Sequence, residues 1–209
     1  MFRKKKIVFI LGMHRSGTSM LSSYINSLGF ELGNNETKDK DDANPLGYFE
    51  NYTFTTAHDN LLSHNGCTWQ LPPRPNLEYT DYHVQQYVDI IGEEFNSNKI
   101  SIKDPRLSFF VDLLDEVSER LQAKTYYLFA TRNKSEVVDS LRKVQRVQKN
   151  EAEALYDITH ECLRPNMLEV SYNKFLAEPK EVRKEICEFL KEKDSKSVIV
   201  DDSLYRIRK

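Results

Sequence analysis

A glycine-flanked polar loop follows the first apolar run of the chain and carries the residues best suited to bind an anion. The sequence from Ile7 to Leu21 reads IVFILGMHRSGTSML. Gly12 and Gly17 allow the backbone to turn tightly around an anion, and the N–H groups of Ser16 to Ser19 would point towards it from a helix N-terminus. Arg15 adds a positive charge within the loop. The spacing predicts a strand, a phosphate- or sulfate-binding loop and the start of a helix.

Charged residues also stand where two later strands are expected to end. Lys103 and Asp104 close the apolar run that begins at Ile100, and Arg132 follows the run TYYLFA. Ligands of an open parallel sheet bind at the carboxyl ends of its strands. Ser140 lies about two helical turns after Arg132, so its hydroxyl is expected to approach the same ligand. Asp104 has a second possible role as the cap of a helix that follows it, and the two roles are compatible.

The loop differs from that of P-loop nucleoside triphosphatases at a defining position. Their pattern is Gly-x-x-x-x-Gly-Lys-Ser/Thr, and here the glycine spacing fits while Thr18 replaces the lysine. Asp104 is the only candidate for a carboxylate that anchors magnesium. The histidines show no metal-site spacing with cysteines or carboxylates. We therefore expect no metal in the site.

These motifs resemble those of the sulfotransferases that use 3′-phosphoadenosine 5′-phosphosulfate (PAPS). The stretch GMHRSGTSML is similar to the 5′-phosphosulfate loop of that family, and TRNKSEVVDS is similar to its 3′-phosphate motif. The segments NPLGYFE and KDPRL resemble segments of its bacterial-type members, so the resemblance covers nearly the whole chain. It implies PAPS as co-substrate and 3′,5′-ADP as product. The donor-binding residues that it implies are His14, Arg15, Ser16, Gly17, Thr18, Ser19, Arg132 and Ser140.

The resemblance also implies in-line transfer of a sulfuryl group to an acceptor hydroxyl, with a carboxylate as general base. The catalytic histidine of many cytosolic members is missing, because Lys103 is followed by Asp104 and Pro105. Other members use a glutamate shortly after the first helix, which makes Glu50 the first choice for the base and Asp104 the second. Arg15 would stabilise charge on the leaving group. Lys103 would balance charge on the sulfuryl group.

Two departures from the family pattern keep other activities open. Lys134 stands where the family has proline, and its late Arg-Lys-Gly loop has no clear counterpart. The basic C-terminal residues Arg206, Arg208 and Lys209 are either a late anion contact or a frayed terminus. A divergent P-loop kinase that uses ATP and a non-catalytic nucleotide-binding protein of the same fold are the alternative functions.

The elements that must position these residues alternate along the chain. Strands are predicted from Ile7, over Ile100–Lys103, over Thr125–Ala130 and over Met167–Val170. Helices are predicted from Gly17 to Leu28 and over Thr55–Leu62, His83–Phe95, Leu107–Leu121, Val137–Val144, Glu151–Leu163 and 171–190, the last interrupted at Pro179. This alternation predicts an α/β fold with P-loop architecture, in which a mostly parallel central sheet has helices on both faces in three layers.

Length and composition limit the architecture and the partners. The 209 residues, 39% of them hydrophobic, favour one domain over 1–209. Within it, 31–76 is expected to be a loop-rich acceptor or lid region, and the charge run over 38–42 is alternatively a solvated surface. The net charge of −2 offers no basic field for nucleic acid, and no apolar run is long enough to span a membrane. Three separated cysteines favour a reducing, cytoplasmic location. The expected partner is a small-molecule or glycan acceptor, and the oligomeric state is left open.

Overall fold

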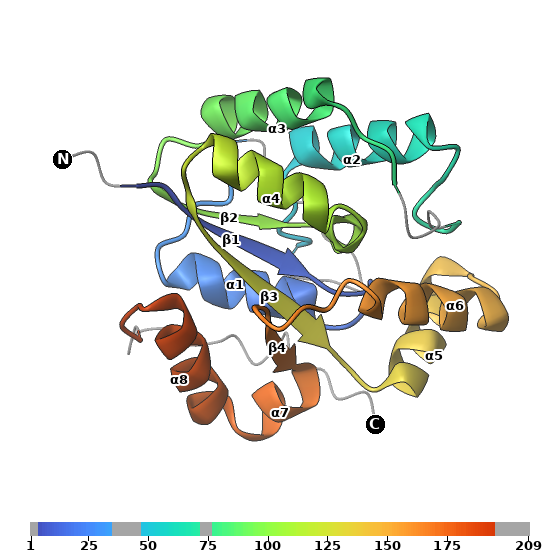
Figure 1. Cartoon of the computed structure of the whole chain (residues 1–209). Coiled ribbons are helices and arrows are strands. Elements are labelled where there is room, and N and C mark those ends of the chain that lie inside the picture. Colours follow the sequence, from blue (N-terminus) through green and yellow to red (C-terminus); the bar gives the residue numbers. More distant parts are fainter. Residues whose placement is uncertain (1–3, 35–46, 72–76, 195–209) are drawn as a thin grey trace.

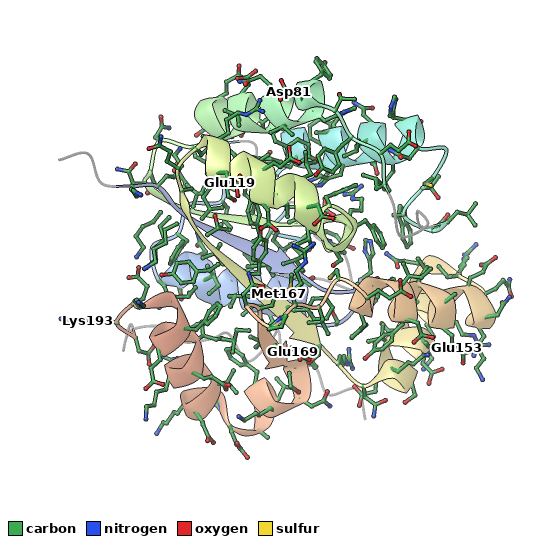
Figure 2. All side chains as sticks on the ribbon, viewed as in Figure 1. Asp81, Glu119, Glu153, Met167, Glu169 and Lys193 are labelled. Carbon is green, nitrogen blue, oxygen red and sulfur yellow. The ribbon has the colours of Figure 1, made fainter. Side chains whose placement is uncertain are left out.

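The computed structural model describes residues 4–34, 47–71 and 77–194 (Figure 1). Part of the predicted acceptor or lid region therefore lies outside the described residues, as do Arg206, Arg208 and Lys209. Charged side chains such as Asp81, Glu119 and Lys193 project from the outer surface of the molecule (Figure 2).

Four parallel strands form the central sheet in the order β2-β1-β3-β4. The strands are β1 (Lys6–Leu11), β2 (Lys99–Lys103), β3 (Lys124–Thr131) and β4 (Leu168–Ser171). Ile7 of β1 is paired with Ile100 of β2 on one side and with Thr125 of β3 on the other. Since every strand runs the same way, all carboxyl ends meet at one edge, with the loop after β1 between β2 and β3. The predicted parallel sheet is confirmed.

Helices cover both faces of the sheet, which confirms the three-layer prediction (Figure 1). Side chains alternate along β1, so that Phe9 packs under one helical layer and Ile10 under the other. The first layer consists of α2 (Tyr52–His64), α3 (Asp81–Glu94) and α4 (Val111–Arg120), and the second of α1 (Thr18–Ser27), α7 (Tyr172–Ala177) and α8 (Pro179–Leu190). A third apolar cluster joins Met13 to α5 (Lys134–Gln145) and α6 (Lys149–His160).

Side-chain caps explain two of the differences between predicted and observed helix starts. The helix expected over Leu107–Leu121 is divided into a 3₁₀ turn, η1 (Pro105–Phe109), and α4. Asp104 caps η1 by accepting a hydrogen bond from the Arg106 N–H at 2.8 Å. The α2 helix begins three residues earlier than expected, because the Asn51 side chain caps it by accepting a hydrogen bond from the Phe54 N–H.

The three cysteines are free thiols, and Cys187 is buried. Within the described ranges, every helix is too short or too polar to cross a lipid bilayer.

Candidate active site

The loop after β1 makes a tight turn that requires both of its glycines. Gly12 has φ 123° and Gly17 has φ 97°, a region that favours glycine. A Cβ atom would lie 2.5 Å from the Ala130 carbonyl oxygen at Gly12 and 2.5 Å from the ring of Tyr172 at Gly17. The turn brings the start of α1 to the carboxyl edge of the sheet, where the first N–H groups of a helix have no carbonyl partner within it.

Ser16 closes this turn and lies outside the pocket beside it. Its N–H donates to the Met13 carbonyl at 3.1 Å, and its hydroxyl donates to the same oxygen at 2.5 Å. The side chain is fully buried. The N–H of Ser16, which the sequence placed among the anion donors, is therefore used to hold the loop together.

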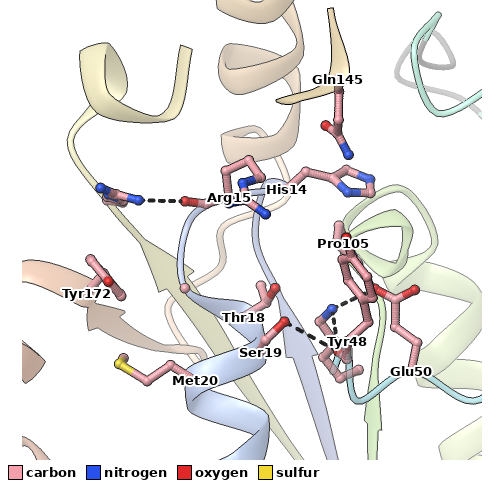
Figure 3. Close-up of a pocket in the computed structure, with 13 residues that line it drawn as sticks. His14, Arg15, Thr18, Ser19, Met20, Tyr48, Glu50, Pro105, Gln145 and Tyr172 are labelled. Carbon is pink, nitrogen blue, oxygen red and sulfur yellow. Dashed lines mark hydrogen bonds and ion pairs between the residues drawn. The ribbon is translucent and has the colours of Figure 1, made fainter. Parts of the chain in front are cut away.

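A pocket lies against the loop and gathers residues from the ends of all four strands (Figure 3). Thr18 lies near its middle, with Tyr172 on one side and Glu50 on the other. The residues that line it are His14, Arg15, Gly17, Thr18, Ser19, Met20, Tyr48, Glu50, Lys103, Pro105, Arg132, Gln145 and Tyr172. Of the predicted site residues, Ser16, Asp104 and Ser140 are not among them.

Arg15 joins the two predicted phosphate motifs. Its Nε donates to the Ser140 hydroxyl at 3.0 Å, and its carbonyl accepts a hydrogen bond from Nη1 of Arg132 at 3.3 Å. Arg132 also pairs with Glu136 one turn along α5, at 2.7 Å. Ser140 thus reaches the site through Arg15, because α5 starts just after β3 and carries Ser140 back over the loop.

Tyr172 is a pocket residue to which the sequence analysis gave no role. It begins α7 immediately after β4, and its ring centre lies 4.7 Å from the guanidinium carbon of Arg132. Burial raises the pKa of its phenol, so the side chain is an uncharged aromatic surface. Its position directly after the fourth strand could have predicted it as a pocket residue, since pocket residues also follow the other three strands.

Glu50 and Lys103 form a nearly buried ion pair on the β2 side of the pocket. Lys103 Nζ lies 2.6 Å from Oε1 of Glu50 and donates to the Tyr48 carbonyl at 3.0 Å. The Lys103 side chain is 2% exposed and the Glu50 side chain 16%. The second oxygen of Glu50 lies 3.9 Å from Nη2 of Arg106. The carboxylate therefore stands in the pocket between two cations.

Asp104 is a buried anchor behind the pocket. It is 0% exposed, with Oδ2 at 2.8 Å from Nδ1 of His58 and Oδ1 at 2.8 Å from Nε of Arg106. Burial alone would raise the pKa of the Asp104 carboxyl, but His58 and Arg106 hold it well below its usual range. A carboxylate with both oxygens engaged and a low pKa is a poor proton acceptor. Of the two predicted carboxylates, Glu50 is thus the one that lines the pocket.

His14 is an uncharged imidazole within the pocket. Its ring lies against Trp69, with 4.6 Å between the ring centres. Burial, followed by the charges of Lys103, Arg106 and Arg15, lowers its pKa to about 3, against the opposing charge of Asp104. The side chain is therefore neutral at physiological pH. Among the described residues, no group of three or more His, Cys, Asp or Glu side chains is placed to hold a metal ion.

Solved structures of sulfotransferase domains share this fold. The domain from the olefin synthase of Synechococcus PCC 7002 is similar with a TM-score of 0.56 and 19% identity, over 98% of this chain and 78% of that one. The domain from the curacin biosynthetic pathway is similar with a TM-score of 0.53 and 17% identity, over 93% and 77%. No protein-family model and no curated protein sequence matches the chain. The predicted resemblance to sulfotransferases is confirmed at the level of the fold.

Proposed function

We propose that the protein transfers a sulfuryl group from PAPS to an acceptor hydroxyl. The observation that carries this proposal is the placement of Arg15, which is bonded to both Ser140 and Arg132 and shares a pocket with the Glu50–Lys103 pair. One end of the pocket thus has the cations that a bisphosphorylated donor needs, and the other has a carboxylate. The similarity in fold to sulfotransferase domains supports the same activity.

The donor would bind along the loop and the β3 end of the sheet. The residues proposed to hold its 5′-phosphosulfate are Arg15, Gly17, Thr18 and Ser19, with Ser16 holding the loop in shape. Arg132 would hold the 3′-phosphate, and the ring of Tyr172 beside it would exclude water from that end of the site. Ser140 would act on the same phosphate directly or by orienting Arg15. A 3′-phosphate contact distinguishes PAPS from ATP.

The transfer step uses groups that the pocket already brings together. The acceptor oxygen forms a bond to sulfur while the bond from sulfur to the bridging phosphate oxygen breaks, and Glu50 takes the proton of the acceptor hydroxyl. Arg15 and the N–H groups at the start of α1 stabilise the charge that develops on the bridging oxygen. Lys103 balances the charge of the sulfuryl group and fixes the position of Glu50.

We place this activity in the cytoplasm, with a small-molecule or glycan acceptor. The three cysteines are free thiols, which fits a reducing compartment.

Ligand binding and sulfate transfer together test the proposal. Calorimetry should show binding of 3′,5′-ADP and none of ATP with magnesium, and labelled PAPS should give labelled product with an acceptor panel. Arg15→Ala should lower transfer by about a hundredfold to a thousandfold, the usual effect of removing one donor to a developing oxyanion. Arg142→Ala removes an exposed arginine of α5 and should leave transfer unchanged.

Other outcomes identify the alternative functions. Tight binding of ATP with magnesium would favour the divergent kinase, and 3′,5′-ADP binding without transfer to any acceptor would favour a non-catalytic nucleotide-binding protein. An Arg15→Ala protein as active as the wild type would contradict the role of the loop.

A further inference from the structure

Two polar atoms in the pocket wall lack hydrogen-bond partners. Among the described residues, Nε2 of His14 and Oε1 of Gln145 are buried and unpaired. Both side chains line the pocket, and Figure 3 shows Gln145 next to the His14 ring. Buried polar atoms in folded proteins are almost always paired, since leaving them unpaired is costly. Two such atoms on one wall of a pocket indicate a ligand group that pairs with them.

The charged neighbours of His14 place this wall in the acceptor half of the pocket. Besides Arg15 of its own loop, they are Lys103, Asp104 and Arg106, all from the end of β2. The proposed base Glu50 pairs with Lys103 at the same end. The residues proposed for the 3′-phosphate lie instead after β3 and β4. A group bound to His14 would therefore lie beside the acceptor hydroxyl.

Packing against one apolar cluster fixes the positions of the two side chains. The His14 ring lies against Trp69 with the two ring planes tilted, and Trp69 packs against the apolar cluster of Met13, α5 and α6. Gln145 is the last residue of α5, and the following Arg146 has a left-handed backbone conformation, φ 55°, that ends the helix. Because both supports belong to the same cluster, the two polar atoms keep a fixed relation to each other.

Resting on the proposed function, we infer that His14 and Gln145 form a subsite for a second hydroxyl of the acceptor, next to the hydroxyl that is sulfated. A neutral imidazole offers one donor and one acceptor, and a primary amide offers both. A hydroxyl also donates and accepts, so it can satisfy both side chains. Carboxylates and phosphates only accept and would leave Oε1 of Gln145 unpaired. An ammonium group could donate to both atoms, but the cations Arg15, Lys103 and Arg106 around His14 disfavour it. The acceptor class is therefore a neutral polyol, carbohydrates included.

This assignment gives His14 a different role from the one that its place in the loop motif predicts. The motif places it with the donor, whereas the subsite places it with the acceptor. The two roles differ in what a substitution changes, which is donor affinity in the first case and acceptor selectivity in the second.

The test compares a diol with the alcohol that lacks its second hydroxyl. The full chain is assayed with PAPS and either cis-1,2-cyclohexanediol or cyclohexanol, and kcat/KM for the diol should be at least about tenfold higher. His14→Phe keeps a ring against Trp69, and Gln145→Met keeps the side-chain length. Each should lower kcat/KM for the diol by about tenfold to a hundredfold, leave that for cyclohexanol unchanged, and keep Kd for 3′,5′-ADP within about twofold. His64→Phe, on the exposed surface of α2, is the matched control.

Three results would overturn the subsite while 3′,5′-ADP still binds. They are equal use of the two alcohols by the wild type, no transfer to the diol at all, or unchanged selectivity in both variants. Loss of 3′,5′-ADP binding in both variants would show that His14 binds the donor, and would also overturn the subsite. A wild-type protein that does not bind 3′,5′-ADP would contradict the proposed function itself, and the subsite with it.

Discussion

Arg15 is the residue that links the two predicted anion-binding motifs. Its backbone has φ 71°, a left-handed conformation that non-glycine residues seldom adopt. In that conformation its carbonyl accepts a hydrogen bond from Arg132 while its Nε donates to Ser140. The orientation of one guanidinium thus depends on residues more than a hundred positions away.

A double-mutant cycle should reveal this dependence. If Ser140 acts by orienting Arg15, Ser140→Ala lowers kcat/KM for PAPS by about tenfold, since a hydrogen bond to a charged group is lost. In the Arg15→Ala background the same change should then have little further effect. Steady-state kinetics of the four proteins gives the coupling. Fully additive effects would show that Ser140 acts on the donor independently of Arg15.

The two candidate carboxylates should respond differently to neutralisation. Glu50→Gln should lower kcat by about a hundredfold to ten-thousandfold while 3′,5′-ADP binding persists, because the proton acceptor is lost. Asp104→Asn should instead lower the free energy of unfolding by about 3–5 kcal/mol, because the buried guanidinium of Arg106 loses its counter-charge. Transfer rates and urea denaturation of both variants distinguish the roles. A folded, stable Asp104→Asn protein without activity would make Asp104 the base.

At the scale of elements, the residues at the strand ends were the part of the candidate site that could best be predicted from the sequence. Two later apolar runs stop at charged residues, Lys103 and Arg132, and in a parallel sheet such residues must meet at one edge. The helix caps were harder to predict from the sequence. Asn51 begins α2 early and Asp104 divides the next helix, and both depend on which side-chain oxygen finds a free N–H.

Gly17, just before α1, packs against Tyr172 at the start of α7, and this contact can be tested. Gly17→Ala adds a methyl group 2.5 Å from the Tyr172 ring at φ 97° and should abolish 3′,5′-ADP binding by displacing the loop. Gly66→Ala is the control, because it shares a positive φ of 67° but has no atom within 4 Å of the added Cβ. Both should lose about 1–3 kcal/mol of stability from backbone strain. Calorimetry and urea denaturation report the difference, and retained binding by Gly17→Ala would contradict the close contact.

At the scale of the whole molecule, the fold was predictable because its signals are periodic and repeated. The continuous apolar run of β1 indicates a strand that is buried on both faces, and the helices packed on each face carry apolar residues at helical spacing. The pocket wall was not predictable in this way. Gln145 and Tyr172 line the pocket and Trp69 lies against His14; the three come from separate segments, and only tertiary packing brings them to the loop.

Acid should destabilise the molecule in two steps. The pKa of His14 is about 3 in the folded protein and about 6.5 in the unfolded chain. Between these pH values the unfolded chain binds a proton at this imidazole and the folded protein does not, which favours unfolding. Stability should fall as pH drops from about 6.5 towards 3, by at most about 1.4 kcal/mol per pH unit for this group. Asp104, whose folded pKa is depressed, adds a further loss below its unfolded pKa of about 3.9.

Urea denaturation at several pH values measures both steps. His14→Phe should flatten the profile between pH 6.5 and 4, because the imidazole whose pKa is lowered by burial is then absent. An unchanged profile for His14→Phe would show that this imidazole takes up its proton in the folded state.

The central place of β1 in the sheet has a consequence for how the chain folds. In the chain β1 comes well before its neighbours β2 and β3, so that during synthesis Ile7 must wait for Ile100 and Thr125. Until then both apolar faces of β1 are exposed to solvent and to other nascent chains. Long-range parallel pairing is slow and prone to aggregation. The strand that precedes the predicted anion loop is thus also a segment open to misassociation until the rest of the sheet has been made.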